Sequence, residues 1–406
     1  MDPTDNPFAP GAGTRPPELA GRDGILENAR VALVRTMKGR AAKGQMVLGL
    51  RGVGKTVLLN RIAEFAEDAG CTQVMLEAPE DKPLAEMLVP PLRKLLFGLS
   101  RKAKARDLAT RGLAVLRSFA SGFQLKVGDV EFSVAPETGT GDSGNLEADL
   151  PEVLRAATEA VKGSGSALVL LIDEVQYLED SELAALIVAA HKLSQRGLPF
   201  ILFGAGLPQL AGLAGEAKSY AERLFDYPEV GPLPHEAARA AIAAPLEAEG
   251  VAITEEALET IVEQTRGYAY FLQEWGAHTW NAAIASPINS SDVSVATKTA
   301  LAALDSGFFR VRYDRLTDRE KDYMRAMAEL GPGPHRSGEI AETLGITVQG
   351  AGPLRSGLIK KGMVYSPQHG DTAFTVPMFD EFMLRSMPDW KPRKKSTRRK
   401  TTRKRR

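Results

Sequence analysis

Two patterns of apolar residues alternate along the first half of the chain. Short continuous apolar runs predict buried strands, and they cover residues 45–49, 73–78, 167–172 and 200–203. Between them, apolar residues recur every three or four positions, as at Leu58, Ile62, Phe65 and Ala69, which predicts amphipathic helices. Strands that alternate with helices over about residues 20–232 predict an α/β fold with a parallel sheet.

From about residue 233 onward the helical period takes over. Windows with helical spacing cover residues 235–248, 254–266, 269–284 and 291–305. We therefore expect the α/β domain to span residues 18–232 and a separate helical region to span residues 233–312.

A third region, residues 313–388, combines helices with a predicted hairpin. Thr317 and Glu320 form a capping box that opens a helix to about Leu330. Two shorter helices are expected over residues 337–344 and about 353–361. Two short strands, residues 363–366 and 372–376, flank a turn.

Three segments lie outside these patterns. Residues 1–17 are rich in proline, glycine and threonine and are predicted to be disordered. Residues 121–134 alternate around Gly128 and Asp129, which predicts a hairpin inserted in the α/β domain. That insert is interpreted as a decorated sheet edge, with a contact to DNA or a partner as the alternative. Residues 389–406 are predicted to form a disordered basic tail.

The charge balance separates this tail from the rest of the chain. The 406 residues contain 51 Lys+Arg and 51 Asp+Glu, a formal net charge of +0. Residues 391–406 contain 11 Lys+Arg and no acidic residue, which leaves 40 basic and 51 acidic residues elsewhere. An acidic body therefore carries a basic tail, and sequence-independent phosphate contact is the use that such a tail favours.

Cysteine content and hydropathy limit the compartment. Cys71 is the single cysteine, so no disulfide can form within one chain. The N-terminal residues lack a basic and apolar signal pattern, and no apolar run approaches the ~18–20 residues of a membrane helix. These features predict a cytoplasmic protein with no membrane partner.

The strongest chemical signal follows the first predicted strand. Residues 49–56 match G-x-x-x-x-G-K-[ST] at every fixed position, in the order Gly49, Leu50, Arg51, Gly52, Val53, Gly54, Lys55 and Thr56. A strand precedes this segment and a helix follows it, as a phosphate-binding loop requires. Backbone N–H groups and the positive end of the helix favour phosphate, and Lys55 adds a cation for the β- and γ-phosphates. The hydroxyl of Thr56 suits Mg²⁺.

A second signal follows the third predicted strand. Asp173 and Glu174 end the apolar run of residues 167–172, a pattern typical of a Walker B motif. Asp173 is predicted to hold Mg²⁺ through water, and Glu174 to orient and deprotonate the attacking water. With the phosphate-binding loop, these carboxylates predict ATP and Mg²⁺ as cofactors and ATP hydrolysis as the reaction.

Over about residues 18–390 the chain resembles an AAA+ P-loop ATPase of the bacterial Orc1/Cdc6-like and STAND-related branch. The resemblance rests on the two motifs and on Gly21-Arg22-Asp23, whose place matches an element that borders the adenine in this family. It implies nucleotide contacts from Gly21 and Arg22, and it implies that residues 233–312 form a helical lid.

The resemblance also raises three points about turnover. Arg223 matches the place of an arginine finger that acts on a neighbouring subunit, with a surface salt bridge as the alternative. Arg266 is either a nucleotide contact or, preferably, part of lid packing with Tyr268, Phe271 and Trp275. The end of the strand after Walker B, residues 203–208, lacks the polar side chain usual in the family. Turnover is therefore expected to be slow or to need stimulation by a partner.

Residues 313–388 resemble a winged helix. The expected recognition helix carries Arg355, Lys360 and Lys361, and the tail adds four further candidate nucleic-acid contacts: Lys394, Lys395, Arg398 and Arg399. Winged helices also dock proteins, and this alternative stays open because a fold alone does not assign function.

Together these features predict an AAA+ ATPase that acts as a nucleotide-dependent switch. Hydrolysis would be coupled to DNA binding or to assembly of a DNA-associated complex, with RNA as a further possibility and with a homo-oligomer or protein partner. The alternative is a STAND-like signalling NTPase whose winged helix binds protein and which has little or no turnover.

Overall fold

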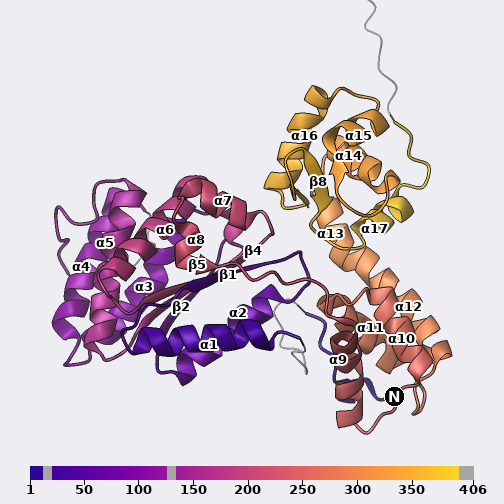
Figure 1. The fold of residues 1–406 in the computed structure, drawn as a ribbon, viewed down its shortest axis with the longest axis horizontal. Coiled ribbons are helices and arrows are strands. Elements are labelled where there is room, and N and C mark those ends of the chain that lie inside the picture. The colour runs from indigo at the N-terminus through magenta and orange to yellow at the C-terminus, as the bar shows by residue number, and fades with distance from the viewer. Residues whose placement is uncertain (12–20, 126–133, 393–406) are drawn as a thin grey trace, which may run out of the picture. The chain divides into compact units, whose positions relative to one another are not determined.

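A computed structural model describes residues 1–11, 21–125 and 134–392. The chain divides between Lys298 and Thr299 into two compact units (Figure 1). Within the described ranges, no helix is both long and apolar enough to span a membrane.

A parallel five-stranded sheet forms the centre of the first unit. Its strand order is β2-β3-β4-β1-β5. The strands span Gly44–Leu48 (β1), Thr72–Glu77 (β2), Leu168–Asp173 (β3), Phe200–Gly206 (β4) and Phe225–Asp226 (β5). Since β4 lies between β1 and β3, the loops that follow β1 and β3 emerge at the same edge on either side of β4. The predicted α/β parallel-sheet fold is confirmed.

Helices cover both faces of this sheet (Figure 1). Helices α1 (Asp23–Met37) and α2 (Lys55–Asp68) pack on one face, against Val47, Leu171 and Phe203. The other face carries α3 (Leu84–Ser100), α4 (Arg106–Gly122), α5 (Leu146–Gly163) and α6 (Asp180–Gln195). Neighbouring residues of each strand point to opposite faces, so a continuous apolar run is required to fill two cores.

Two short helices connect β4 to β5. They are α7 (Leu210–Ala217) and α8 (Ala221–Leu224). The structure places β5 at Phe225–Asp226, with a single further bridge between Leu48 and Glu229. Polar and proline residues in this stretch explain why regular pairing ends early.

Four helices form the predicted helical region of the first unit and the link to the second. They are α9 (His235–Ala248), α10 (Glu255–Thr265), α11 (Ala269–Ala282) and α12 (Ser290–Leu304). Phe271 and Trp275 are buried between them, and the Trp275 indole donates to Thr297 Oγ1 at 3.1 Å. The predicted packing role of these aromatic side chains is confirmed.

Residues 1–11 correct the prediction of a disordered N-terminus. They include a 3₁₀ helix at Pro3–Asp5, and they pack against α11. The Phe8 ring is buried against Gly276, and Trp280 Nε1 donates to the Asp2 carbonyl at 2.7 Å. The composition predicted disorder because prolines and glycines surround Phe8. Burial of the Phe8 ring against α11 explains why these residues are ordered instead.

The predicted hairpin insert is corrected at one end and lies mostly outside the described residues. Residues 121–122 belong to α4. Residues 126–133 are not among those that the structure describes.

The second unit begins with the last residues of α12, which a π-helical segment, Asp305–Phe309, and α13 (Arg310–Tyr313) follow. Its further helices are α14 (Asp318–Glu329), α15 (Ser337–Thr343), α16 (Val348–Lys360) and α17 (Phe379–Ser386). A small antiparallel sheet has the order β6-β8-β7, formed by His335–Arg336, Asp371–Phe374 and Val364–Tyr365. Phe309, Phe379 and Phe382 lie in the core of the second unit.

Helix α16 begins earlier than predicted. Thr347 caps it by accepting the Gly350 backbone N–H, so the helix starts at Val348 rather than near Pro353. Pro353 lies inside α16, which continues through it although proline donates no backbone hydrogen bond there. The Thr317–Glu320 capping box of α14 is confirmed.

Candidate active site

The loop between β1 and α2 is built from backbone that only glycine accommodates. Gly52 and Gly54 have φ values of +79° and +94°, in the left-handed region. A Cβ on Gly49 would lie 2.3 Å from the Val230 carbonyl oxygen. Gly54 is the N-cap of α2 and contributes no side-chain cap, so it leaves the backbone N–H groups of the first helical turn for an anion to bind.

Lys55 lies inside this curve. Its side chain is buried, and Nζ donates to the carbonyl oxygens of Gly49 and Leu50 at 3.0 and 2.9 Å. Burial lowers the pKa of Lys55, and the nearby carboxylates of Glu174 and Asp173 oppose that shift. The ammonium is thus held by two weak carbonyl partners, which a phosphate group can replace.

Thr56, in the first turn of α2, contacts Asp173 at the end of β3. The Thr56 hydroxyl donates to Asp173 Oδ2 at 2.5 Å, and Asp173 Oδ1 accepts the Glu174 backbone N–H at 2.8 Å. Only 4% of Asp173 is exposed, and burial raises its pKa while the Thr56 hydrogen bond works against that rise. A hydroxyl and a carboxylate at this separation are hard oxygen ligands, so the pair fits a Mg²⁺ ion.

Glu174 is held from two sides. Its backbone is left-handed, with φ of 54°, and its Oε1 lies 3.4 Å from Arg51 Nη1 of the phosphate-binding loop. Gln176 Nε2 donates to Glu174 Oε2, and Gln176 Oε1 accepts the Leu207 backbone N–H at 3.0 Å. Sequence reasoning did not single out Gln176, although its place two residues after Glu174 was available as a signal.

The helical region also reaches the phosphate-binding loop. The Tyr270 backbone N–H, at the start of α11, donates to the Gly52 carbonyl at 3.0 Å. Arg266, at the end of α10, has a left-handed backbone with φ of 52°. The sequence placed Tyr270 in the lid without indicating this contact.

Gly21 and Arg22 lie next to the segment that follows β5. Arg22 Nη2 donates to the Gly231 carbonyl, and burial lowers the pKa of the guanidinium. A Cβ on Gly21 would lie 3.3 Å from Ala237 Cβ of α9. Because Val230 touches Gly49, these residues and the phosphate-binding loop flank the same short segment.

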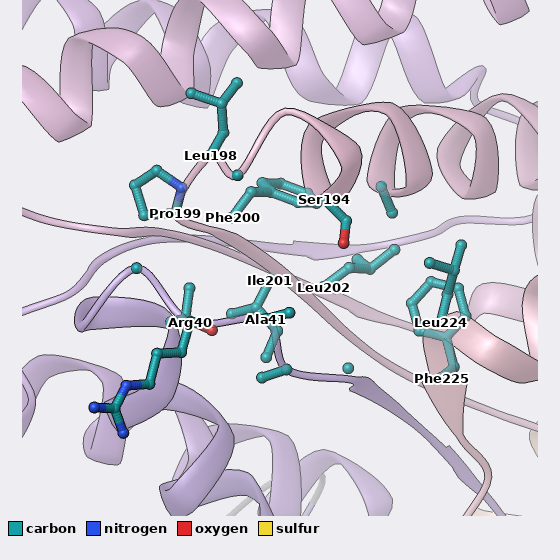
Figure 2. A pocket seen from close by; sticks show the side chains of 16 residues that line it. Arg40, Ala41, Ser194, Leu198, Pro199, Phe200, Ile201, Leu202, Leu224 and Phe225 are labelled. Carbon is teal, nitrogen blue, oxygen red and sulfur yellow. The ribbon is translucent and has the colours of Figure 1, made fainter.

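Arg223 lies away from this constellation. It is exposed on α8, and the following strand β5 pairs with Gly44 and Gln45, the first residues of β1. The phosphate-binding loop follows the opposite end of β1. A pocket at the amino ends of β1, β4 and β5 is lined by Arg40, Phe225 and neighbouring residues, with none from the phosphate-binding loop (Figure 2).

The candidate nucleic-acid residues of the second unit differ in their contacts. Arg355 donates to Thr372 Oγ1 at 2.8 Å and to the Asp371 carbonyl at 2.9 Å. Lys361 pairs with Glu320 at 2.7 Å. Lys360 is exposed. The tail candidates Lys394, Lys395, Arg398 and Arg399 lie outside the described residues. Arg355 and Lys361 are thus engaged within the second unit, and contact of all three cations with nucleic acid stays a prediction.

Comparisons with known proteins bear on both units. Residues 18–203 match a family described as "AAA ATPase domain", and residues 306–383 match a domain family of unknown function. No curated protein matches the chain significantly in sequence.

Solved structures are similar over most of the chain at low identity. A Walker-type ATPase of Pyrococcus abyssi is 16% identical with a TM-score of 0.58, over 91% of this chain and 97% of that chain. The Orc1 protein of Aeropyrum pernix, solved in complex with DNA, is 17% identical with a TM-score of 0.45, over 92% and 94%. The RuvB Holliday junction branch migration motor of Thermotoga maritima is 17% identical with a TM-score of 0.44, over 89% and 96%.

Proposed function

We propose that this chain binds ATP with Mg²⁺ and hydrolyses it to ADP and phosphate, and the match of residues 18–203 to the AAA ATPase domain family supports this. One observation carries the proposal. Thr56, in the first turn of α2, and Asp173, at the end of β3, lie 2.5 Å apart (Oγ1 to Oδ2) beside Lys55 and Glu174. A cation-binding pair, a phosphate-binding lysine and a candidate base therefore share one edge of the sheet.

The chemistry assigns a task to each side chain. Thr56 Oγ1 and Asp173 would hold Mg²⁺, which when bound offsets the negative charge of the phosphates. Lys55 would exchange its bonds to the Gly49 and Leu50 carbonyls for phosphate oxygens. Glu174 would orient a water and accept its proton as the water oxygen attacks the γ-phosphorus and the bond to ADP breaks.

Slow or partner-stimulated turnover is part of the proposal. The end of β4 presents Gly206 and Leu207, neither of which has a polar side chain to place beside the γ-phosphate. Arg223 is exposed at the other edge of the sheet. It would therefore act as an arginine finger only on the nucleotide of a second copy, which makes a homo-oligomer the active form.

For the output of the switch, we propose DNA binding through the second unit and the basic tail, in the cytoplasm. Composition supports this, because residues 391–406 contain 11 cationic and no acidic residues. Helices α14, α15 and α16, followed by the β7–β8 hairpin, have the order expected for a winged helix.

A second candidate is a STAND-like protein whose second unit binds a protein partner. The contacts of Arg355 and Lys361 favour it, because both cations are engaged within the unit. Less of the positive charge is then free for phosphates than the sequence indicates.

Steady-state ATP hydrolysis tests the enzyme. We expect Lys55→Ala and Glu174→Gln each to lower kcat at least tenfold, whereas Lys94→Ala, an exposed change on α3, leaves it unchanged. Lys55→Ala should also lose ATP affinity, and Glu174→Gln should keep it. Tight ATP binding by the wild type with no turnover, with or without duplex DNA, would contradict hydrolysis and favour the second candidate.

Fluorescence anisotropy with labelled duplex DNA tests the output. We expect salt-dependent binding that weakens when residues 391–406 are deleted and when the exposed Lys360 is changed to Glu. Deletion and Lys360→Glu variants that bind DNA like the wild type would remove these surfaces from the proposal. The same measurement with RNA of matched length shows whether the chain prefers DNA or RNA.

A further inference from the structure

The side chains around Glu174 fix the orientation of its carboxylate. Each of its oxygens has a partner from a different segment. Arg51 of the phosphate-binding loop lies beside Oε1 at 3.4 Å, and Gln176 donates to Oε2. Two partners on opposite oxygens restrict both the direction and the rotation of the carboxylate plane.

The backbone at Glu174 adds a further constraint. A non-glycine residue with φ of 54° is uncommon, and such a conformation persists where its surroundings impose it. On one side, the Asp173 side chain accepts the Glu174 N–H. On the other, Val175 is 2% exposed and anchors the 3₁₀ turn Val175–Tyr177 in the core. The turn therefore has little freedom to move Glu174.

Gln176 is fixed in turn by the end of β4. Its Oε1 accepts the Leu207 backbone N–H at 3.0 Å. A Cβ at Gly206 would lie 2.9 Å from the same oxygen, so glycine leaves the room that the Gln176 amide fills. The Gly206 carbonyl also accepts the Gly49 N–H at 3.1 Å, which ties this strand end to the start of the phosphate-binding loop.

Arg51 is braced by the same 3₁₀ turn. Its Nη2 donates to the Tyr177 hydroxyl, and its guanidinium lies 6.0 Å from the Tyr177 ring centroid. Arg51 and Gln176 thus form, with Glu174 and Tyr177, a closed set of contacts that links the phosphate-binding loop, the turn after β3 and the end of β4.

We propose that Gln176 and Arg51 are positioning residues for Glu174, and that the Gln176 amide makes the link between the base and the end of β4 that no β4 side chain supplies. The inference rests on the proposed ATP hydrolysis. Gln176 sets the direction in which Glu174 accepts the proton of the attacking water, while Arg51 relates that direction to the phosphate-binding loop.

The test compares Gln176→Leu with Gln195→Leu, the same change at an exposed position on α6. Turnover and the affinity for a fluorescent ATP analogue with Mg²⁺ are measured separately. We expect Gln176→Leu to lower kcat by about 10- to 100-fold, with KM and analogue affinity within about threefold of the wild type. Gln195→Leu should match the wild type in all three.

A second variant, Gln176→Glu, gives a readout that a purely structural role would not move. The new carboxylate has nearly the size of the amide but cannot donate to Glu174 Oε2, so kcat should fall while analogue affinity stays within about threefold of the wild type. Arg51→Met should also lower kcat, because the contact with Glu174 Oε1 is lost.

The outcomes separate the inference from the proposed function. A wild type that turns over ATP, with Gln176→Leu within twofold of its kcat, overturns the inference alone. Equal losses of kcat and analogue affinity also overturn it, since they indicate a damaged site. A wild type that binds the analogue without turnover overturns both.

Discussion

At the scale of single residues, Asp173 lies where its ionised carboxylate lowers the stability of the fold. It is 4% exposed, and burial raises its pKa above the ordinary value of 3.8. The ionised carboxylate therefore destabilises the folded state at every pH above that raised pKa, and the cost disappears as the pH falls below about 4. A residue of this kind is retained for what it binds.

Replacing Asp173 with Asn should separate these two effects. An Asn amide can still accept the Glu174 N–H and donate to the Thr56 hydroxyl, so the contacts survive without the buried charge. We expect Asp173→Asn to raise the unfolding temperature at pH 7.5 by about 2–4 °C without nucleotide, as about 1 kcal/mol does in a domain of this size. The added stabilisation by ATP with Mg²⁺ should be lost.

Differential scanning fluorimetry checks this prediction, with Asp81→Asn as the control at an exposed position. A lower unfolding temperature for Asp173→Asn would contradict the assigned cost of the charge.

Cys71 offers a second residue-scale prediction. It is partly buried after α2, and burial raises its pKa to about 11. At pH 8 only about one thiol in a thousand is then a thiolate, the reactive form. We expect the native protein to react with a disulfide reagent such as DTNB far more slowly than the protein unfolded in guanidinium chloride. Equal rates would contradict the burial of this thiol.

The sequence predicted the residues of the site whose spacing is local and missed those whose contacts are not. Lys55 and Thr56 belong to one motif, and Asp173 and Glu174 end one strand, so a pattern of residue types locates each pair. Gln176 follows Glu174 by two residues, but its contact with Leu207 depends on β4 lying beside β3. Arg355 shows a related limit, because charge is evident in a sequence whereas its hydrogen bonds to Thr372 and Asp371 are not, and its contact with nucleic acid stays a prediction.

At the scale of elements, Gly276 is an unfavourable residue for the interior of a helix. It lies inside α11, where glycine costs about 1 kcal/mol relative to alanine. The structure gives the reason, since a Cβ there would lie 2.5 Å from the Phe8 ring. Glycine thus makes room for the N-terminal segment, residues 1–11, against the lid.

A double-mutant cycle tests that account. With Phe8 present, we expect Gly276→Ala to lower stability, because the methyl group displaces the ring. With Phe8→Ala, the same change should raise stability by about 0.5–1 kcal/mol through helix propensity alone. The change of sign, measured by denaturant unfolding, is the expected result.

A spectroscopic readout accompanies the cycle. Trp280 donates to the Asp2 carbonyl, so release of the segment should shift tryptophan emission to longer wavelength. Phe8→Leu is the matched control, because it keeps an apolar side chain at the position. If Gly276→Ala changes stability equally in both backgrounds, Phe8 and Gly276 are energetically independent, which would contradict this account.

Elements with strong periodicity were predicted well, and the errors fell where one tertiary contact decides. The helices α9 to α12 differ from their predicted bounds by a few residues at most. Residues 1–11 and the start of α16 differ more, because a buried Phe8 and the Thr347 cap outweigh the composition around them. Prolines and glycines in both segments reduce helix and strand propensity without excluding order.

At the scale of the whole molecule, the proposed switch joins two units with separate tasks. The candidate nucleotide residues lie between Gly21 and Tyr270, in the first unit, and the candidate DNA residues lie in the second. The sequence places the boundary before the third region at residues 312–313, whereas the structure divides the chain between Lys298 and Thr299. Neither boundary carries information about coupling. Coupling is a free energy between two binding events and has to be measured as one.

Reciprocal binding measurements provide that test. If ATP favours the DNA-binding form, ATP and duplex DNA must raise each other's affinity by the same factor, because the two routes to the ternary complex have equal free energy. We expect a factor of about 5 to 150, the usual range for allosteric coupling. Glu174→Gln is the suitable protein, since it should bind ATP without consuming it, and the salt concentration must be constant because DNA affinity depends on it. Affinities that each ligand leaves unchanged would show that nucleotide binding and DNA binding are independent, and they would contradict the switch even if the chain were both an ATPase and a DNA-binding protein.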